Sequence, residues 1–265
     1  MLIVKTSSDL SDMLINRNVA KKQIGFVATM GALHRGHISL LERSKKENDT
    51  SVCSIFVNPR QFNDSNDLKN YPRPIENDII LLTEAGCDIL FLPAAEEIYN
   101  ADYIEPKIDL FGLESLLEGS SRPGHFKGVA VVVSRLFDCV KPDRAYFGQK
   151  DFQQTLVIKE LVRQFNLPIE IVINDIVREE SGLAMSSRNI RIPTDKLQKA
   201  GFIYDALLQL KQNVRKISIN ESLDIAKQEI LKNKLTKIEY LEIVNPETLK
   251  TISDLTNQLH AIANY

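Results

Sequence analysis

Short apolar segments alternate with amphipathic segments along the first two-thirds of the chain. The apolar segments are rich in β-branched or aromatic residues and are predicted strands, at residues 24–29, 51–57, 89–92, 144–147 and 169–172. The amphipathic segments between them are predicted helices, at residues 37–47, 75–85, 128–140 and 152–165. Strands and helices that alternate in this way form βαβ units, with a mainly parallel sheet covered on both faces. The pattern therefore predicts an α/β fold.

The pattern changes after about residue 174, where the alternation stops. Residues 175–193 are polar and loop-like, and a different arrangement of amphipathic segments follows them. A change of this kind marks a candidate domain boundary, which we place near residue 175. We therefore predict an α/β domain at residues 1–175 and a smaller α+β domain at residues 176–265.

The second part contains two predicted helices and one predicted strand. Thr194 is the predicted N-cap of the first helix, because its hydroxyl can accept a hydrogen bond from the first turn. The residues that share one face of this helix are Ala200, Ile203, Tyr204, Leu207 and Leu208. A second helix is predicted at residues 221–233, and residues 237–244 are predicted to form a strand before an Asn245-Pro246 turn.

The composition is that of an ordinary soluble globular protein. The 265 residues include 33 basic and 35 acidic side chains, so the formal net charge is −2, and 43% of the residues are hydrophobic. A chain of this length can form one large domain or two modest ones with a sizeable core. Its near-neutral charge gives no general electrostatic reason to bind nucleic acid or an anionic membrane.

The sequence shows no membrane span, no secretory signal and no cysteine framework. Its most apolar run, at residues 129–133, is far shorter than the roughly 18 residues that cross a bilayer. The N-terminus lacks the basic region, apolar block and cleavage site of a signal peptide. Cys53, Cys87 and Cys139 are widely spaced in apolar surroundings, so we expect three reduced core thiols in a cytoplasmic protein.

The most informative segment is GFVATMGALHRGH at residues 25–37, where a predicted strand leads directly into a predicted helix. A helix start carries unpaired backbone N–H groups and a partial positive charge, so it attracts phosphate. Gly36 has no Cβ to block the close approach of a base or sugar. His34 and His37 lie near one helical face and can both donate to phosphate oxygens. These features suit a nucleotide whose α-phosphate is attacked.

Two other interpretations of this segment stay open from the residues alone. The histidines could be half of a metal site, although the other histidines are His125 and His260 and the chain has no HExxH pattern. They could also be ordinary histidines on a helix surface. The sequence contains neither a GxxxxGK[ST] loop nor a GxGxxG fingerprint, so the usual competing nucleotide-binding motifs are missing.

A second segment, GLAMSSRN at residues 182–189, complements the first from far along the chain. The hydroxyls of Ser186 and Ser187, followed by the guanidinium of Arg188, can bind the β- and γ-phosphates of a leaving pyrophosphate. A helix-capping or linker loop would use these residues equally well. Together with the histidine motif, the segment makes the sequence resemble the HIGH-type nucleotidyltransferase superfamily, whose second signature is a mobile KMSKS-like loop. Here the stretch reads MSSRN, without the usual lysines.

More narrowly, the sequence is similar to the pantothenate synthetase family. Six blocks agree in order across about residues 20–190: TMGALHRGH, SIFVNPRQF, YPR, RPGHFKGV, PDRAYFGQKDFQQ and GLAMSSRN. The resemblance implies a Rossmann-like parallel-sheet N-terminal domain and a smaller C-terminal lid domain that carries the MSSRN loop. It implies a homodimeric ligase that joins pantoate to β-alanine through a pantoyl adenylate. ATP would be cleaved to AMP and pyrophosphate, and Mg²⁺ would be required.

The resemblance also implies roles for individual residues. The expected catalytic residues are His37, His34 and Lys150. The expected ATP-binding residues are Met30, His34, Gly36, His37, Gly148, Lys150, Asp151, Val177, Met185, Ser186, Ser187 and Arg188. The expected substrate-binding residues are Met30, Gln61 and Gln154. His37 would protonate or stabilise the departing group, and Asp78 would be the metal ligand, near Mg²⁺ and pyrophosphate.

Several of these positions have plainer interpretations. Taken alone, Gln61 is expected to cap a core strand, and Gln154 to be an exposed helix residue. Their neutral amides can equally donate to and accept from the hydroxyls and carboxylate of pantoate. Lys150 and Asp151 could form an exposed turn, or could bind phosphate and the ribose hydroxyls. Asp78 could be a solvated charge on a helix.

Three features fit the family pattern less closely or have no assigned role. Arg35 fills the variable position inside the histidine motif, which is tolerated if its side chain points away. Arg122 and His125 are expected in a flexible segment over the substrate pocket. The chain stops at residues 260–265, where the family commonly continues with a glycine- and arginine-containing segment.

Two other functions are alternatives to the ligase. A nucleotidyltransferase of the same superfamily would leave AMP attached to a phosphate ester and release no free AMP. A non-catalytic nucleotide- or tRNA-binding module would bind ATP without turnover or carry a basic groove, which the net charge of −2 makes unattractive. The expected partners are therefore the small molecules pantoate, β-alanine and ATP, without nucleic acid or membrane.

Overall fold

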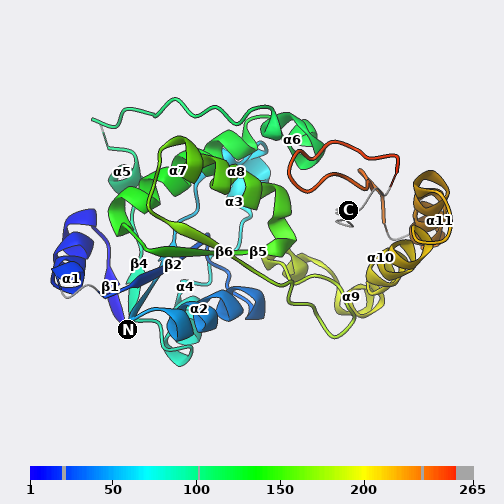
Figure 1. The fold of residues 1–265 in the computed structure, drawn as a ribbon. Coiled ribbons are helices and arrows are strands. Elements are labelled where there is room, and N and C mark those ends of the chain that lie inside the picture. Colours follow the sequence, from blue (N-terminus) through cyan, green and yellow to red (C-terminus); the bar gives the residue numbers. More distant parts are fainter. Residues whose placement is uncertain (20–21, 101, 234–235, 255–265) are drawn as a thin grey trace. The chain divides into compact units, whose positions relative to one another are not determined.

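The structure is a computed structural model that describes residues 1–19, 22–100, 102–233 and 236–254. The chain divides into two compact units, Met1–Val177 and Arg178–Tyr265 (Figure 1). The C-terminal residues 255–265, with His260 among them, lie outside the described residues. Among the helices of the described residues, none is both long and apolar enough to cross a bilayer.

A parallel sheet forms the centre of the first unit. Its strands are β1 (Leu2–Val4), β2 (Ile24–Thr29), β3 (Thr50–Ile55), β4 (Ile89–Phe91), β5 (Arg144–Gly148) and β6 (Glu170–Asn174). They lie in the order β1-β4-β3-β2-β5-β6, and every neighbouring pair is parallel. The predicted strands and the α/β parallel-sheet fold class are confirmed. The pattern missed β1, a three-residue edge strand in which only Val4 is buried.

Helices of two lengths connect these strands. The longer ones are α1 (Ser7–Val19), α2 (Arg35–Glu47), α4 (Ile75–Glu84), α7 (His125–Val140) and α8 (Phe152–Gln164). The shorter ones are α3 (Ser65–Lys69), α5 (Ala95–Ile98) and α6 (Leu117–Ser121), with 3-10 turns η1 (Pro59–Gln61), η2 (Leu113–Ser115) and η3 (Gln149–Asp151). The four predicted helices are confirmed to within three residues at each end.

The two faces of the sheet carry different helices. Because side chains alternate along a strand, Phe26 of β2 packs on one face and Val27 on the other. The Phe26 face is covered by α1, α7 and α8, and the Val27 face by α2 and α4. Figure 1 shows α7 and α8 on the side of the sheet opposite to α2 and α4. Both faces are therefore buried, as a parallel sheet requires.

The strand order reverses between β2 and β5. From β2 the chain moves to β3 and β4 on one side, whereas β5 and β6 lie on the other side of β2. In open parallel sheets, ligands bind in the crevice outside the carboxyl ends of the strands at such a switch point. The fold therefore directs attention to the ends of β2 and β5.

The described part of the second unit is mainly helical. It contains the 3-10 helix η4 (Ser187–Arg191) and the helices α9 (Thr194–Lys199), α10 (Phe202–Asn213) and α11 (Ile219–Lys232). Its core consists of Ala206, Leu210, Val214, Ile219, Leu223, Ala226, Ile230, Leu241 and Ile243. The predicted helix at residues 221–233 is confirmed as α11, and the predicted turn forms because the Asn245 side chain accepts hydrogen bonds from Glu247 N and Thr248 N.

The first predicted helix of this unit is wrong in three details. It is two helices, α9 and α10, separated by Ala200 and Gly201. Pro193, rather than Thr194, is the N-cap of α9, and no side chain caps it. Leu208 is 40% exposed, so it does not share the buried face that Ile203 and Leu210 form.

The predicted strand at residues 237–244 is also wrong. Within the described residues, this segment forms one isolated antiparallel bridge, between Val244 and Thr251, and no ladder. Leu241 and Ile243 are nevertheless fully buried in the core that α10 and α11 form. The alternation in the sequence therefore reflects burial against two helices and not pairing with another strand.

Candidate active site

A cavity of about 160 Å³ lies at the carboxyl ends of β2 and β5, at the switch point of the sheet. Six of the predicted site residues line it: Met30, His37, Gln61, Gly148, Asp151 and Gln154. They come from three of the sequence blocks and from both sides of the switch point. Of the other predicted residues, His34 and Gly36 flank the start of α2, and Lys150 lies in η3 beside Asp151.

The two histidines at the start of α2 orient each other through the backbone. His34 is the N-cap, and its Nδ1 accepts a hydrogen bond from Gly36 N at 3.1 Å. The Nδ1 of His37 accepts from His34 N at 3.3 Å. Because each Nδ1 acts as an acceptor, the hydrogen of each neutral ring is on Nε2. The ring centroids lie 4.0 Å apart, so the two imidazoles are direct neighbours at the helix start.

His37 is neutral in this arrangement. Burial lowers the pKa of His37 to about 3, with a further lowering by the neighbouring His34 and a smaller opposite effect of Asp151. At neutral pH the ring can therefore donate a hydrogen bond but carries no extra proton. The predicted role of stabilising a departing group fits this state, whereas protonation by an imidazolium does not.

Asp78 is buried beneath the loop that precedes these histidines. The residue is 1% exposed, its Oδ2 accepts from Ala32 N at 2.8 Å, and its Oδ1 accepts from Leu33 N at 2.7 Å. Burial raises the pKa of Asp78, although these two hydrogen bonds act against the rise. The described residues hold no cluster of three or more His, Cys, Asp or Glu side chains suited to a metal. Each carboxylate oxygen thus accepts one backbone hydrogen bond, and the role of Asp78 as a Mg²⁺ ligand stays a prediction.

The amide of Gln61 has a defined orientation. The Oδ1 of Asn58 accepts from Arg60 N at 3.2 Å, and the Nδ2 of Asn58 donates to the Gly128 oxygen at 3.1 Å, so main-chain groups identify both ends of the Asn58 amide. The same Nδ2 donates to Oε1 of Gln61 at 3.1 Å. Because its oxygen is used in this way, Gln61 offers its N–H groups to a ligand in the cavity.

Helix α7 packs directly on the turn that carries Gln61. A Cβ on Gly128 would lie 2.4 Å from the Arg60 oxygen and 2.9 Å from Gln61 N, so only glycine allows this approach. His125, the first residue of α7, is 6% exposed, and its Nδ1 donates to the main-chain oxygen of Gln61 at 2.8 Å. Burial lowers the pKa of His125, and Arg122 lowers it further. His125 is therefore a buried support for Gln61, and the expected flexibility of the segment that contains Arg122 and His125 stays a prediction.

The turn from β5 into α8 supplies the opposite side of the cavity. Gly148 ends β5, and a Cβ at this position would meet open space. Lys150 pairs with Asp151 at 2.8 Å, and both side chains are substantially exposed. Loss of hydration alone would raise the pKa of Asp151, but the charge and the hydrogen bond of Lys150 lower it. The carboxylate is therefore ionised beside the neutral His37, and Gln154 follows in the first turn of α8.

Apolar side chains form the rest of the cavity wall, and nothing in the sequence marks them as site residues. They are Leu40, Phe56, Val129, Val132, Val133 and Leu136, and Ala28, Thr29, Tyr71, Tyr146 and Phe147 also line the cavity. The four α7 residues among them have helical spacing, which predicts a core face. They do belong to the core, and they also face the cavity. The helical spacing of apolar residues therefore cannot distinguish a face that only packs in the core from one that also forms a cavity wall.

The remaining predicted residues lie at or beyond the boundary between the units. Val177 is the last residue of the first unit, and Met185, Ser186, Ser187 and Arg188 belong to the second. Ser186 is the N-cap of η4, and its Oγ accepts from Arg188 N at 3.3 Å. The capping interpretation of this loop is therefore confirmed, and its contact with phosphates stays a prediction.

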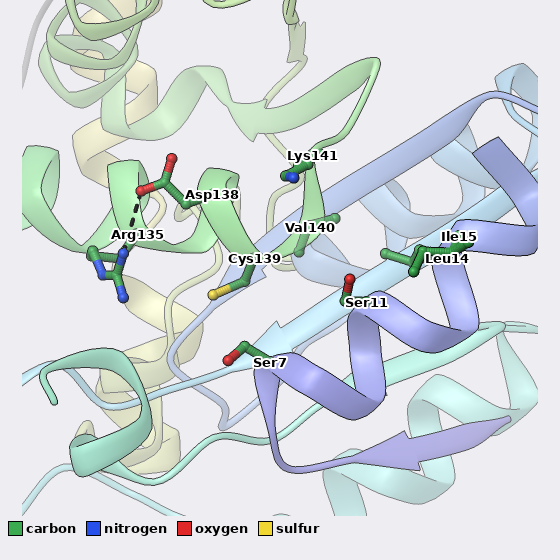
Figure 2. Close-up of a pocket in the computed structure, with 9 residues that line it drawn as sticks. All are labelled: Ser7, Ser11, Leu14, Ile15, Arg135, Asp138, Cys139, Val140 and Lys141. Atoms are coloured by element: carbon green, nitrogen blue, oxygen red, sulfur yellow. Dashed lines mark hydrogen bonds and ion pairs between the residues drawn. The ribbon is translucent and has the colours of Figure 1, made fainter. Parts of the chain in front are cut away.

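A second cavity, of about 270 Å³, lies between α1 and the C-terminal end of α7 (Figure 2). It is larger than the first, but the chemistry predicted from the sequence places no residue in it. Its charged side chains are Lys141 and the ion pair of Arg135 with Asp138 at 3.4 Å, so basic and acidic groups are mixed. The volume of a cavity alone therefore does not identify the active site. The cavity at the switch point is the better candidate because the predicted site residues line it.

Comparisons with known proteins agree with one another. A profile of the family described as pantoate-beta-alanine ligase matches residues 2–265. The pantothenate synthetase of Cytophaga hutchinsonii is 46% identical over 260 residues, which cover 97% of this chain and 92% of that protein. The crystal structure of pantothenate synthetase from Thermus thermophilus has a TM-score of 0.90 at 44% identity, covering 97% of this chain and 91% of that one.

A third relative carries ligands. The pantoate-beta-alanine ligase from Francisella tularensis has been crystallised in complex with beta-gamma ATP and beta-alanine. Its structure has a TM-score of 0.77 at 37% identity, and the match covers 92% of this chain and 90% of that one. The similarity therefore extends over nearly the whole length of each protein.

Proposed function

We propose a two-step reaction for this chain, which belongs to the pantoate–β-alanine ligase family and is a ligase that forms pantothenate. In the first step, a carboxylate oxygen of pantoate attacks the α-phosphorus of ATP, and pyrophosphate leaves. In the second step, the amine of β-alanine attacks the pantoyl carbonyl carbon, AMP leaves, and the amine loses a proton. A carboxylate is a poor acyl donor because oxide is a poor leaving group, and the pantoyl adenylate replaces oxide by AMP.

The switch-point cavity is the proposed pantoate subsite, with Met30, Gln61 and Gln154 as its binding residues. Its volume of about 160 Å³ is below the ~300–1,000 Å³ typical of sites for drug-sized ligands, so it suits a small acid better than a whole nucleotide. The apolar wall on α7 matches the two methyl groups of pantoate. The N–H groups of Gln61 match its oxygens, because a carboxylate accepts hydrogen bonds and does not donate them.

The start of α2 is the proposed site of the ATP phosphates. The Nε2–H groups of His34 and His37 supply two donors, and the backbone N–H groups of the helix start add a partial positive charge. These donors are held before ATP arrives, so they can stabilise the charge that develops as pyrophosphate leaves. The loss of one preorganised donor typically costs about 10²–10³ in rate.

The other predicted residues complete the proposed ATP site. Asp151 is ionised and can accept from the ribose hydroxyls, and Lys150 can reach phosphate if it leaves Asp151. Gly36 and Gly148 leave room for the nucleotide. The residues proposed to meet adenine or the outer phosphates are Val177, Met185, Ser186, Ser187 and Arg188.

Several broader features belong to the same proposal. Mg²⁺ accompanies ATP and is held mainly by its phosphates and by water, because Mg²⁺ keeps much of its water and needs few protein ligands, and the carboxylate of Asp78 is engaged by Ala32 N and Leu33 N. The predicted domain at residues 176–265, which corresponds to the second unit, Arg178–Tyr265, is the proposed lid. We place the enzyme in the cytoplasm as a homodimer, and the free cysteines Cys53, Cys87 and Cys139 agree with a reducing compartment.

The observation that supports this mechanism best is the meeting of His37, Gln61 and Gln154 around one cavity. The test is exchange of labelled pyrophosphate into ATP. We expect exchange that depends on pantoate and does not need β-alanine, because the adenylate forms before the amine reacts. Exchange that requires β-alanine would contradict the two-step mechanism. Release of free AMP together with pantothenate in the complete reaction separates this enzyme from a nucleotidyltransferase that leaves AMP on its product.

A further inference from the structure

The loop that joins β2 to α2 has an unusual backbone. Gly31 has a φ of +79° and Ala32 a φ of +49°, so two consecutive residues adopt the left-handed conformation. Glycine adopts this conformation at little cost, but a residue with a Cβ pays roughly 1–2 kcal/mol. Surrounding contacts must hold the loop in this form. The loop also sets the position of His34, which follows it directly as the N-cap of α2.

The contacts that hold the loop converge on its successive N–H groups. Gly31 N donates to Thr29 Oγ1 at 3.2 Å, Ala32 N to Asp78 Oδ2 at 2.8 Å, and Leu33 N to Asp78 Oδ1 at 2.7 Å. Successive N–H groups in a turn of this kind form a concave anion site, which in other proteins receives phosphate. Here the anion in the concave site is a carboxylate of the chain itself.

The carboxylate comes from a distant part of the sequence and fits closely. Asp78 lies in the first turn of α4, 45 residues after Leu33, and is 1% exposed. A Cβ on Gly31 would lie 3.0 Å from Asp78 Oδ2 and 3.1 Å from Ile55 Cγ2, so the loop is pressed against both. A solvated helix charge would be exposed and would make no such contacts.

We propose that Asp78 is a positioning residue: its buried carboxylate occupies the anion site of the β2–α2 loop and thereby fixes His34 and His37. It also occupies the N–H groups of Ala32 and Leu33, which a phosphate could otherwise contact. ATP phosphates are then directed to the histidine donors at the helix start. The role of these histidines toward ATP rests on the proposed function above.

The first test replaces the carboxylate by an amide of the same shape. In Asp78→Asn one oxygen becomes an NH₂ group, which cannot accept from a backbone N–H, so one of the two loop contacts is lost. We expect kcat for AMP formation to fall by about 10²-fold, because small displacements of catalytic groups have effects of that size. KM for ATP and pantoate should change much less. The matched control is Glu76→Gln, an exposed acid in the same first turn of α4, which should leave the rate unchanged.

A double-mutant cycle tests the link to the histidine. If Asp78 acts by positioning His37, the effect of Asp78→Asn should shrink when His37 is already replaced by Gln. Equal losses of rate in the wild-type and His37→Gln backgrounds would overturn the proposal. So would recovery of Asp78→Asn by excess Mg²⁺, which is the result expected of a metal ligand. An inactive wild-type chain would instead contradict the proposed function, so the two failures are distinguishable.

A measurement on the unmodified protein covers the case in which Asp78→Asn does not fold. Backbone amides that donate to a buried carboxylate exchange their hydrogens slowly with solvent. The amides of Ala32 and Leu33 should therefore be strongly protected in the full-length chain. Exchange as fast as that of an exposed loop amide would show that the carboxylate does not hold the loop, and the proposal would fail.

Discussion

The two sides of the cavity are built in different ways. On the β2–α2 side, His34 and His37 are oriented by backbone groups within three residues of themselves, and one distant carboxylate supports the loop. On the α7 side, Gln61 is oriented by Asn58, by the His125 ring and by a helix that approaches its main chain. The first side is local in sequence, whereas the second depends on packing between residues more than 60 positions apart.

This difference predicts two kinds of functional damage. Changes on the histidine side should reduce the rate of the chemical step, because the donors there act on developing charge. Changes on the α7 side should weaken the binding of pantoate, because that wall orients an amide and shapes an apolar surface. The ratio of the effect on kcat to the effect on KM therefore distinguishes the two sides.

The largest effect is expected from His37→Ala. Its Nε2–H is lost, and the rate of pyrophosphate exchange should fall by about 10²–10⁴. His37→Gln should retain more activity, because an amide N–H can approximate the position of Nε2. Glu42→Gln, an exposed change farther along α2 that removes only a surface ion pair with Arg35, serves as the control. Near-normal exchange in His37→Ala would remove this residue from the mechanism.

The next largest effect is expected from Gly128→Ala, on the other side. The new Cβ would lie 2.4 Å from the Arg60 oxygen, so α7 and the Gln61 turn must separate. We expect KM for pantoate to rise by about tenfold or more, and the free energy of unfolding to fall by about 1–3 kcal/mol. Steady-state kinetics with each substrate varied, and urea unfolding, provide the measurements.

The control for this change is its exposed neighbour, Lys127→Ala. The Lys127 side chain is 62% exposed and makes a surface ion pair with Glu105 at 3.5 Å, so its loss should matter little. KM for ATP should stay close to the wild-type value in Gly128→Ala. An equal rise of KM for ATP and pantoate would mean that the two sides are not independent.

A smaller effect is expected from Tyr99→Phe. The Tyr99 hydroxyl donates to Asn58 Oδ1 at 2.8 Å and so helps to fix the amide that orients Gln61. A neutral hydrogen bond contributes about 0.5–1.5 kcal/mol, which corresponds to a rise of KM for pantoate of roughly two- to tenfold. Tyr103→Phe is a matched control, because the buried Tyr103 hydroxyl has no hydrogen-bond partner in the described part of the chain. Equal effects of the two changes would contradict the proposed network.

The same contrast explains how far the sequence predicts the site. The histidine motif is readable because the end of the strand, the start of the helix and both donors fall within thirteen consecutive residues, 25–37. The sequence does not reveal the position of Asp78, because an acid in a first helical turn is common and nothing nearby shows which amides it meets. Gln61 is predictable only by resemblance, since its orientation comes from Asn58 and α7 after folding.

Prediction of the fold from the sequence is limited in a similar way. The strands of the sheet are predictable because strands buried on both faces are rich in apolar residues, as in β2, although β3 also buries Thr50, Ser51 and Ser54. In the second unit, residues 237–244 alternate like a strand but pack on α10 and α11 without a ladder. Apolar spacing reports which residues are buried. It does not report whether the neighbour is a strand, a helix or the wall of a cavity.

The smallest effect concerns the histidine side. It is a dependence of the free energy of unfolding on pH. The pKa of His37 is about 3 in the folded chain and about 6.5 when the residue is exposed. Between these values the unfolded chain binds a proton that the folded chain does not, so the free energy of unfolding should fall as the pH decreases from about 6.5 toward 3. One such group contributes at most about 1.4 kcal/mol per pH unit, and partial exposure of the ring reduces this.

Replacement by glutamine removes this contribution, because glutamine does not titrate. Urea unfolding at pH 7 and pH 5 should therefore show a smaller loss of stability in His37→Gln than in the wild-type chain. Some loss should persist in His37→Gln, since burial also lowers the pKa of His125. Identical losses in the two proteins would mean that His37 is already protonated in the folded chain at pH 5. The α2 donor would then be an imidazolium, and the acid role that the neutral ring excludes would become available.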